Sequence, residues 1–309
     1  MEDRKMGGWE RNKRFRFIIL LSSHLPILLF TYLPILLLSS CYENREGCLD
    51  SRATNFGIDA DRECDNCCTF PQLKLVFEHK LLKDNAANLT YTDTIYKDDF
   101  DNEFRVKDIQ FYVSNARLVR ANGTEVYPTD SLNVNIQPPG SAAQAVKISN
   151  NVGLVNRNDF TALEMGTFIT SGDFMKVRFN IGLNQILNQV IPTSLPDSVV
   201  NHPLENTAMY ISADSGFLFN RLQLFNNPTK TDTTFRTIRI FQPDSVQVEL
   251  PFLGGINILE GFNVRITLRI NYLEWFKGIN LKTDPPAMLA TKISGNLRNS
   301  LTVTRVELQ

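Results

Sequence analysis

The sequence is poor in histidine and tryptophan, with three and two of these residues among 309. It also has no excess of basic residues, since 32 Lys and Arg stand against 33 Asp and Glu. No basic patch is present, so a nucleic-acid-binding surface is not expected. A Gly-x-Ser-x-Gly motif, a glycine-rich phosphate loop and internal repeats are absent as well. These absences argue against serine hydrolases and nucleotide-binding enzymes.

One long uncharged, mostly apolar run is present, over residues 17–38, directly after a cluster of basic residues. It ends in Leu38-Ser39-Ser40-Cys41, which has the form of a bacterial lipoprotein cleavage site. We therefore predict that residues 1–40 are a lipoprotein signal peptide and that Cys41 is the acylated N-terminus. The expected location is the cell envelope, as an outer-membrane lipoprotein that is periplasmic or surface-exposed, with the lipid anchor binding the membrane.

The alternative for this run is an uncleaved N-terminal anchor, because about 20 apolar residues suffice to span a bilayer. Pro26 and Pro34 interrupt the run and disfavour a continuous helix. Cleavage would remove six basic and three acidic residues and leave a net charge of −4. It would also remove His24 and Trp9, so two histidines and one tryptophan would remain.

Four cysteines follow within a short segment that has no apolar periodicity: Cys48, Cys64, Cys67 and Cys68. Outside the cytoplasm they should form two disulfides. A bridge between the adjacent Cys67 and Cys68 would strain the peptide, so Cys48 and Cys64 should each pair with one of these two, in either order. A zinc site is the weaker alternative, because zinc-binding cysteines are usually separated by at least two residues. The sequence predicts a disulfide-stapled module over residues 41–70.

From residue 71 onward, apolar and polar residues alternate in many short segments, as in half-buried β-strands. The clearest alternation covers residues 109–114, 176–181 and 263–272, and shorter runs cover residues 73–77, 234–241, 246–250 and 301–308. A helical pattern occurs around residues 184–190 and 272–277. We predict an all-β domain over residues 71–309, an antiparallel β-sandwich with short helical turns.

Five blocks in this domain resemble, in their order, the MbnP-like copper-binding domain found in lipoproteins of the Bacteroidetes type. The blocks are residues 73–79, 104–118, 177–184, 201–204 with 209–210, and 215–219. The resemblance implies an extracytoplasmic β-sandwich, often encoded beside a diheme peroxidase-like partner. It further implies copper held by histidines and a tryptophan oxidised to kynurenine.

Only some residues of this copper site have a match in the chain. His79 and His202 match the histidines of the family pattern, and Met209 or Glu78 is a candidate third donor. Where the family tends to show tryptophan after Met-Tyr, this chain has Ile211-Ser212-Ala213-Asp214. The family's C-terminal histidine is also missing. The resemblance therefore implies a copper site at His79, His202 and Met209 that is intact or degenerate.

Simpler interpretations exist for both histidines. His79 has the same parity as Leu73, Leu75 and Phe77 and could point into the core, whereas His202 before a proline could be a turn residue. Three functions follow: a non-enzymatic copper-binding lipoprotein, a metal-free structural or ligand-binding surface lipoprotein, and a hydrolase that uses two carboxylates. We expect a binding protein rather than an enzyme.

Overall fold

The computed structural model describes residues 44–81, 87–88, 94–157, 161–229, 231, 233–241 and 245–309. The predicted signal peptide over residues 1–40 and the lipidation site Cys41 lie outside these ranges. Within the ranges, no helix has both the length and the apolar character that crossing a bilayer requires.

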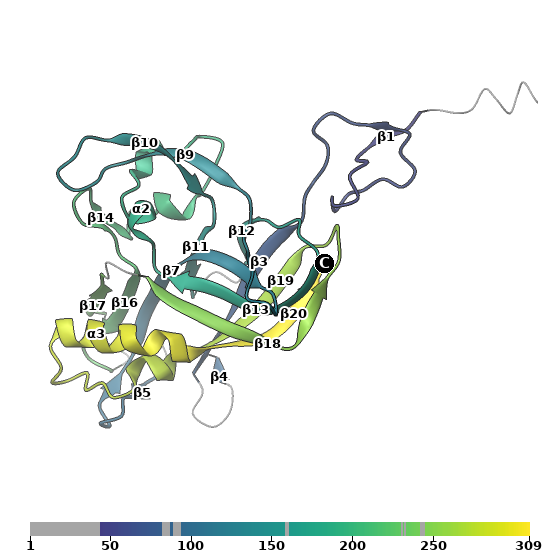
Figure 1. The fold of residues 1–309 in the computed structure, drawn as a ribbon. Coiled ribbons are helices and arrows are strands. Elements are labelled where there is room, and N and C mark those ends of the chain that lie inside the picture. Colours follow the sequence, from purple (N-terminus) through teal and green to yellow (C-terminus); the bar gives the residue numbers. More distant parts are fainter. Residues whose placement is uncertain are drawn as a thin grey trace, which may run out of the picture.

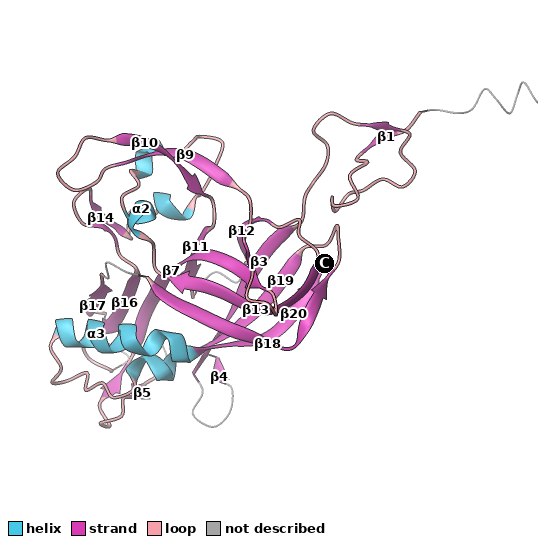
Figure 2. Ribbon diagram, viewed as in Figure 1, coloured by secondary structure: helices cyan, strands magenta, loops and turns pink. Residues whose placement is uncertain are grey.

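Most strands belong to two sheets that face each other (Figures 1 and 2). The seven-stranded sheet has the path β17 (Phe235–Ile240), β16 (Asn220–Phe225), β7 (Val106–Val119), β13 (Gly172–Ile181) and β18 (Val246–Ile258), with β11 (Val152–Asn156) and β8 (Glu125–Val126) paired to β7. The five-stranded sheet has the path β12 (Leu163–Thr167), β3 (Gln72–Leu81), β19 (Val264–Asn271) and β20 (Leu301–Leu308), with β4 (Ala87–Asn88) paired to β3.

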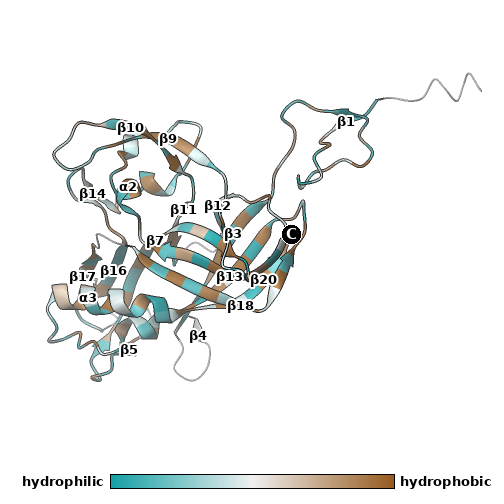
Figure 3. Ribbon diagram, viewed as in Figure 1, coloured by the Kyte–Doolittle hydropathy of each residue, from teal (hydrophilic) through white to brown (hydrophobic). Residues whose placement is uncertain are grey.

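A single apolar cluster fills the space between the two sheets and confirms the all-β sandwich. Side chains of β3 and β19 meet those of β7, β13, β16, β17 and β18 in this cluster. Phe77 of β3 and Phe111 of β7, for example, have ring centroids 5.9 Å apart across the interface. Alternation of apolar and polar residues along these strands, visible in Figure 3, puts one face of each strand in the core.

Two features of the sandwich differ from the prediction. Strands β3 and β19 pair in parallel, from Leu73 opposite Val264 to Lys80 opposite Asn271, whereas an antiparallel sandwich was expected. The two strands are far apart in sequence, so no tight turn dictates their relative direction. An α-helix, α3 (Pro286–Asn296), was also missed.

The helical pattern of α3 is weak because Thr291, Ser294 and Gly295 have low helix propensity. Leu289 and Ile293 nevertheless lie one turn apart and reach the sandwich core. Helix α3 contacts β17 and two 3₁₀ helices, η4 (Tyr272–Phe276) and η5 (Leu297–Ser300). The predicted short helical turns are confirmed as η4 and as α2 (Gln185–Asn188).

A third layer, which we call the cap, covers the outer face of the seven-stranded sheet (Figure 1). The cap consists of the hairpin β9 (Ser131–Ile136) and β10 (Gln144–Ser149), helix α2, the 3₁₀ helices η2 (Pro192–Ser194) and η3 (Pro203–Glu205), and the pair β14 (Tyr210–Ser212) and β15 (Gly216–Phe217). Its apolar side chains form a second cluster together with Tyr112 of β7. A further small pair, β5 (Tyr96–Lys97) and β6 (Glu103–Phe104), precedes β7.

The cysteine-containing segment forms a separate small module, as predicted. It holds the parallel pair β1 (Glu46–Gly47) and β2 (Arg62–Glu63), and its disulfides join Cys48 to Cys68 and Cys64 to Cys67. This pairing is one of the two that the sequence left open. The module precedes β3, which begins at Gln72.

Candidate functional site

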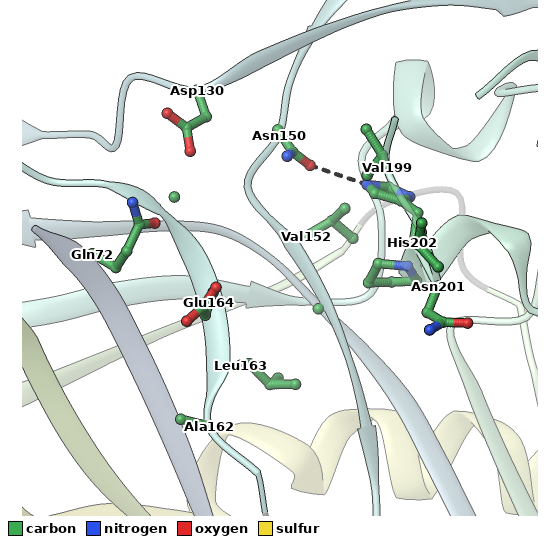
Figure 4. Close-up of a pocket in the computed structure, with 14 residues that line it drawn as sticks. Gln72, Asp130, Asn150, Val152, Ala162, Leu163, Glu164, Val199, Asn201 and His202 are labelled. Atoms are coloured by element: carbon green, nitrogen blue, oxygen red, sulfur yellow. Dashed lines mark hydrogen bonds between the residues drawn. The ribbon is translucent and has the colours of Figure 1, made fainter. Parts of the chain in front are cut away.

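His202 is fixed in the cap by three hydrogen bonds. It is the N-cap of η3, where its Nδ1 accepts from the backbone N–H of Leu204 at 3.2 Å. The Glu205 carboxylate in turn accepts from the backbone N–H of His202 at 3.1 Å. With Nδ1 acting as acceptor, Nε2 carries the proton and donates to Oδ1 of Asn150 at 3.0 Å (Figure 4). Both ring nitrogens of His202 are therefore engaged.

Burial lowers the pKa of the His202 imidazole below its ordinary value, although the nearby Glu205 carboxylate acts in the opposite direction. The residue is 5% exposed. It is consequently neutral at physiological pH, in agreement with one donor and one acceptor nitrogen. This geometry agrees with the interpretation of His202 as a turn residue, because His202 is the N-cap residue of a capping box.

His79 lies in the sandwich core at the carboxyl end of β3. Its Nδ1 is 2.7 Å from the Tyr272 hydroxyl, and the two rings are stacked with their centroids 5.8 Å apart. Burial, with a smaller contribution from the positive charge of Arg157, lowers the pKa of His79 to about 4. Its Nε2 is buried and has no hydrogen-bond partner among the described residues. The inward direction that parity suggested is thus confirmed.

The structure does not bring His79 and His202 together. His79 lies on the side of Phe111 and Trp275, whose rings are 5.7 Å apart in the sandwich core. His202 lies in the cap, where the Tyr112 hydroxyl donates to the carbonyl of Pro203 at 3.0 Å. Because Phe111 and Tyr112 are adjacent on β7 and point to opposite faces, the seven-stranded sheet separates the two histidines.

The candidate third donors do not complete a site either. Met209 is fully buried in the apolar cluster of the cap, on the side of His202, whose nitrogens are already engaged. Glu78 alternates with His79 on β3 and its Oε2 faces Arg269 Nε at 3.4 Å. Within the described parts of the chain, no three His, Cys, Asp or Glu side chains are placed to hold one metal ion. The predicted donor set therefore does not fit a shared copper ion.

A cavity of about 310 Å³ lies beside His202, between the cap and the edges of both sheets. Its wall is formed by the start of β3, by β11 and β12, by the residues that flank the β9–β10 hairpin, and by the loop before η3. The polar lining residues are Gln72, Asp130, Asn150, Glu164, Asn201 and His202. Figure 4 shows their side chains around the cavity, together with the apolar Val152 and Leu163.

Several of these polar groups are held in place by the fold. The Gln72 amide donates to Thr167 Oγ1 at 3.0 Å, and Asp130 Oδ2 accepts from the Thr167 backbone N–H at 3.1 Å. Glu164 Oε1 pairs with Lys74 Nζ at 2.9 Å. A bound molecule would thus meet groups with little freedom left to lose, which favours binding.

The charged side chains that line this cavity are acidic. Two carboxylates, Asp130 and Glu164, line it, whereas no lysine or arginine among the described residues does. Sequence reasoning missed all the polar lining residues except His202, because they come from five separated segments with no common motif. Among these residues, Asn201 has a left-handed φ of 58°, a conformation that asparagine adopts more readily than most other residues.

Comparisons with known proteins bear on the whole domain. A family model described as MbnP matches residues 71–291. The solved structure of MbnP from Methylosinus trichosporium is similar at 11% sequence identity, covering 71% of this chain and 86% of that chain, with a TM-score of 0.37. A search of curated proteins finds no significant match.

Proposed function

Given that the chain belongs to the MbnP family, we propose that it is a lipid-anchored, extracytoplasmic binding protein whose small ligand occupies the cavity beside His202. The carrying observation is that His202, Asn150, Gln72 and Asp130 are fixed in the wall of this cavity by hydrogen bonds. The function is binding without turnover, and Cys41 is the anchor that holds the protein to the membrane.

The lining chemistry favours a neutral ligand that carries several hydroxyl groups, such as a monosaccharide. Carboxylate and amide side chains accept and donate hydrogen bonds to hydroxyls, and the apolar surface of Val152 and Leu163 suits the C–H face of a sugar ring. An anion would meet the carboxylate of Asp130, which no basic residue in the described lining balances, whereas Glu164 is already paired with Lys74. The volume is near the lower end of the range of roughly 300–1,000 Å³ for ligand pockets, which limits the ligand to a small molecule.

Copper bound jointly by His79, His202 and Met209 is not part of this proposal. The two histidines lie on opposite sides of the seven-stranded sheet, and neither nitrogen of His202 has a lone pair free for a metal. Titration of the purified protein with Cu(I) under anaerobic conditions tests this point. A stoichiometric, tight site that disappears in both His79→Gln and His202→Gln would overturn the proposal.

Ligand binding is tested by saturation-transfer NMR and calorimetry with glucose and N-acetylglucosamine, with phosphate and ethanolamine as probes of anionic and cationic ligands. Asp130→Asn should weaken sugar binding by about 10–100-fold, because a hydrogen bond to a charged acceptor contributes roughly 1.5–3 kcal/mol. Asp197→Asn, at an exposed residue that does not line the cavity, is the matched control and should bind as the parent does.

Two results would refute this assignment: binding of phosphate in preference to both sugars, or sugar binding that Asp130→Asn leaves unchanged. The anchor is tested independently. Mass spectrometry should find acyl chains on Cys41, and Cys41→Ser should move the protein out of the membrane fraction.

A further inference from the structure

The cysteine module carries several large apolar side chains on its surface. Ile58 is 85% exposed, and Phe56 and Leu49 are 45% and 42% exposed. In so small a module these side chains do not serve the core, because the buried apolar positions there are Cys48 and Ala53. Surface clusters of this kind mark interaction sites in soluble proteins.

A second exposed apolar pair lies against the module, on the turn between β18 and β19. Leu259 and Phe262 of this turn are 53% and 43% exposed. The turn contacts the module directly, because Ser51 Oγ donates to Glu260 Oε2 at 3.3 Å. A Cβ atom at Gly261, which has φ +78°, would lie 3.1 Å from the carbonyl oxygen of Ala53. The module and the turn therefore form one end of the molecule.

This end lies next to the point where the chain meets the membrane. Cys41 precedes Asn44, the first described residue, by three residues, which span at most roughly 11 Å. The segment after Ile58 folds back onto this entry point, since the backbone N–H of Asp61 donates to the carbonyl of Arg45 at 2.8 Å. Ile58 is thus held close to the anchored end of the chain.

We propose that the cysteine module and the β18–β19 turn rest on the surface of the membrane that holds the anchor, with Ile58, Phe56, Leu49, Leu259 and Phe262 in contact with lipid. This inference rests on the lipid anchor of the proposed function. Because an anchored protein stays within reach of the bilayer, a few exposed apolar side chains suffice to fix its orientation. The cavity beside His202 would then be held at a set orientation to the membrane.

The net charge of the cysteine module indicates which lipid headgroups it can contact. Residues 44–70 contain six acidic and three basic side chains, and Asp59 directly follows Ile58. Repulsion would oppose contact with an anionic surface, so the partner is a zwitterionic one. The apolar side chains should enter the boundary between headgroups and acyl chains, a depth of roughly 5–10 Å.

The test uses the full acylated protein in vesicles of phosphatidylcholine, with tryptophan as a depth probe. In Ile58→Trp, lipids brominated near the headgroup end of the acyl chain should quench the added fluorescence. Met288→Trp is the matched control, since Met288 is 46% exposed on α3, which lies far from the cysteine module (Figure 1). The brominated lipids should not quench the added fluorescence of this control. Phe262→Trp probes the β18–β19 turn and should behave as Ile58→Trp does.

Equal quenching of the added fluorescence in Ile58→Trp and Met288→Trp, after subtraction of the Trp275 background, would overturn the inference. Exchange of phosphatidylcholine for phosphatidylglycerol should reduce the quenching in Ile58→Trp, and an increase would contradict the charge argument. Failure of the anchor is a distinguishable result, because the protein would then not sediment with vesicles at all. An anchored protein whose introduced tryptophan in Ile58→Trp stays in water leaves the proposed function standing and removes only this orientation.

Discussion

The burial of His79 makes the stability of the protein depend on pH in a way that one substitution can isolate. His79 has a pKa of about 4 in the folded protein against 6.5 for a free imidazole. Between these values the unfolded chain binds a proton that the folded protein does not, so the free energy of unfolding falls as pH falls from about 7 toward 4. Linkage gives a loss of about 2 kcal/mol between pH 8 and pH 5 from this residue alone.

His79→Phe removes the titration while it keeps an aromatic ring beside Tyr272, which stacks on the histidine. Because the Tyr272 hydroxyl would lose its contact with Nδ1, the double variant with Tyr272→Phe is the better comparison. Urea unfolding at pH 8 and pH 5, followed by the fluorescence of the buried Trp275, should show about 2 kcal/mol less acid destabilisation in the double variant than in the parent. Equal acid destabilisation of the two proteins would refute the reasoning.

Three further substitutions test other parts of the structure. Gly166→Ala should cost at least about 1 kcal/mol in calorimetry, because Gly166 has φ +111° beside the cavity, and an unchanged melting temperature would contradict this. Trp275→Phe should lower the free energy of unfolding by about 1–3 kcal/mol, since the indole N–H donates to the buried Ser300 hydroxyl at 3.0 Å. In a protein that already carries Ser300→Ala, Trp275→Phe should lower the free energy of unfolding by less, because this hydrogen bond is already absent. Removal of the Cys48–Cys68 bridge by serine should destabilise the module by about 3 kcal/mol, given the separation of 20 residues, and expose it to proteolysis while the β-domain melts unchanged.

Much of the sandwich could be predicted because apolar and polar residues alternate along most of its longer strands. The segment 301–308 was located at the bounds of β20, and 263–272 matches β19 to within one residue at each end. Such strands have one buried and one exposed face, so the local sequence carries the signal. Strands β9 and β10 were missed although apolar and polar residues alternate in β9 and over most of β10, because each alternation covers no more than six residues. Strand β12 was missed because the alternation does not extend over its five residues.

Relations between distant segments were harder to predict. The parallel pairing of β3 with β19 and the cavity beside His202 both depend on which segments meet, not on any one of them. Asp130, Asn150 and Glu164 belong to no motif in the sequence. They come together as lining residues of one cavity only when the cap folds over the edges of both sheets. The disulfide order was likewise a choice between two pairings that local geometry could not decide.

The two histidines show why a set of matching residues does not by itself make a site. The simpler interpretations were that His79 points inward, by its parity on β3, and that His202 before Pro203 is a turn residue, and the structure agrees with both. Neither inference states which core each ring enters. That depends on β7, whose Phe111 faces the sandwich core and whose Tyr112 hydroxyl bonds beside His202. A metal ion common to both rings would have to displace this central strand, so the two histidines cannot bind the same ion.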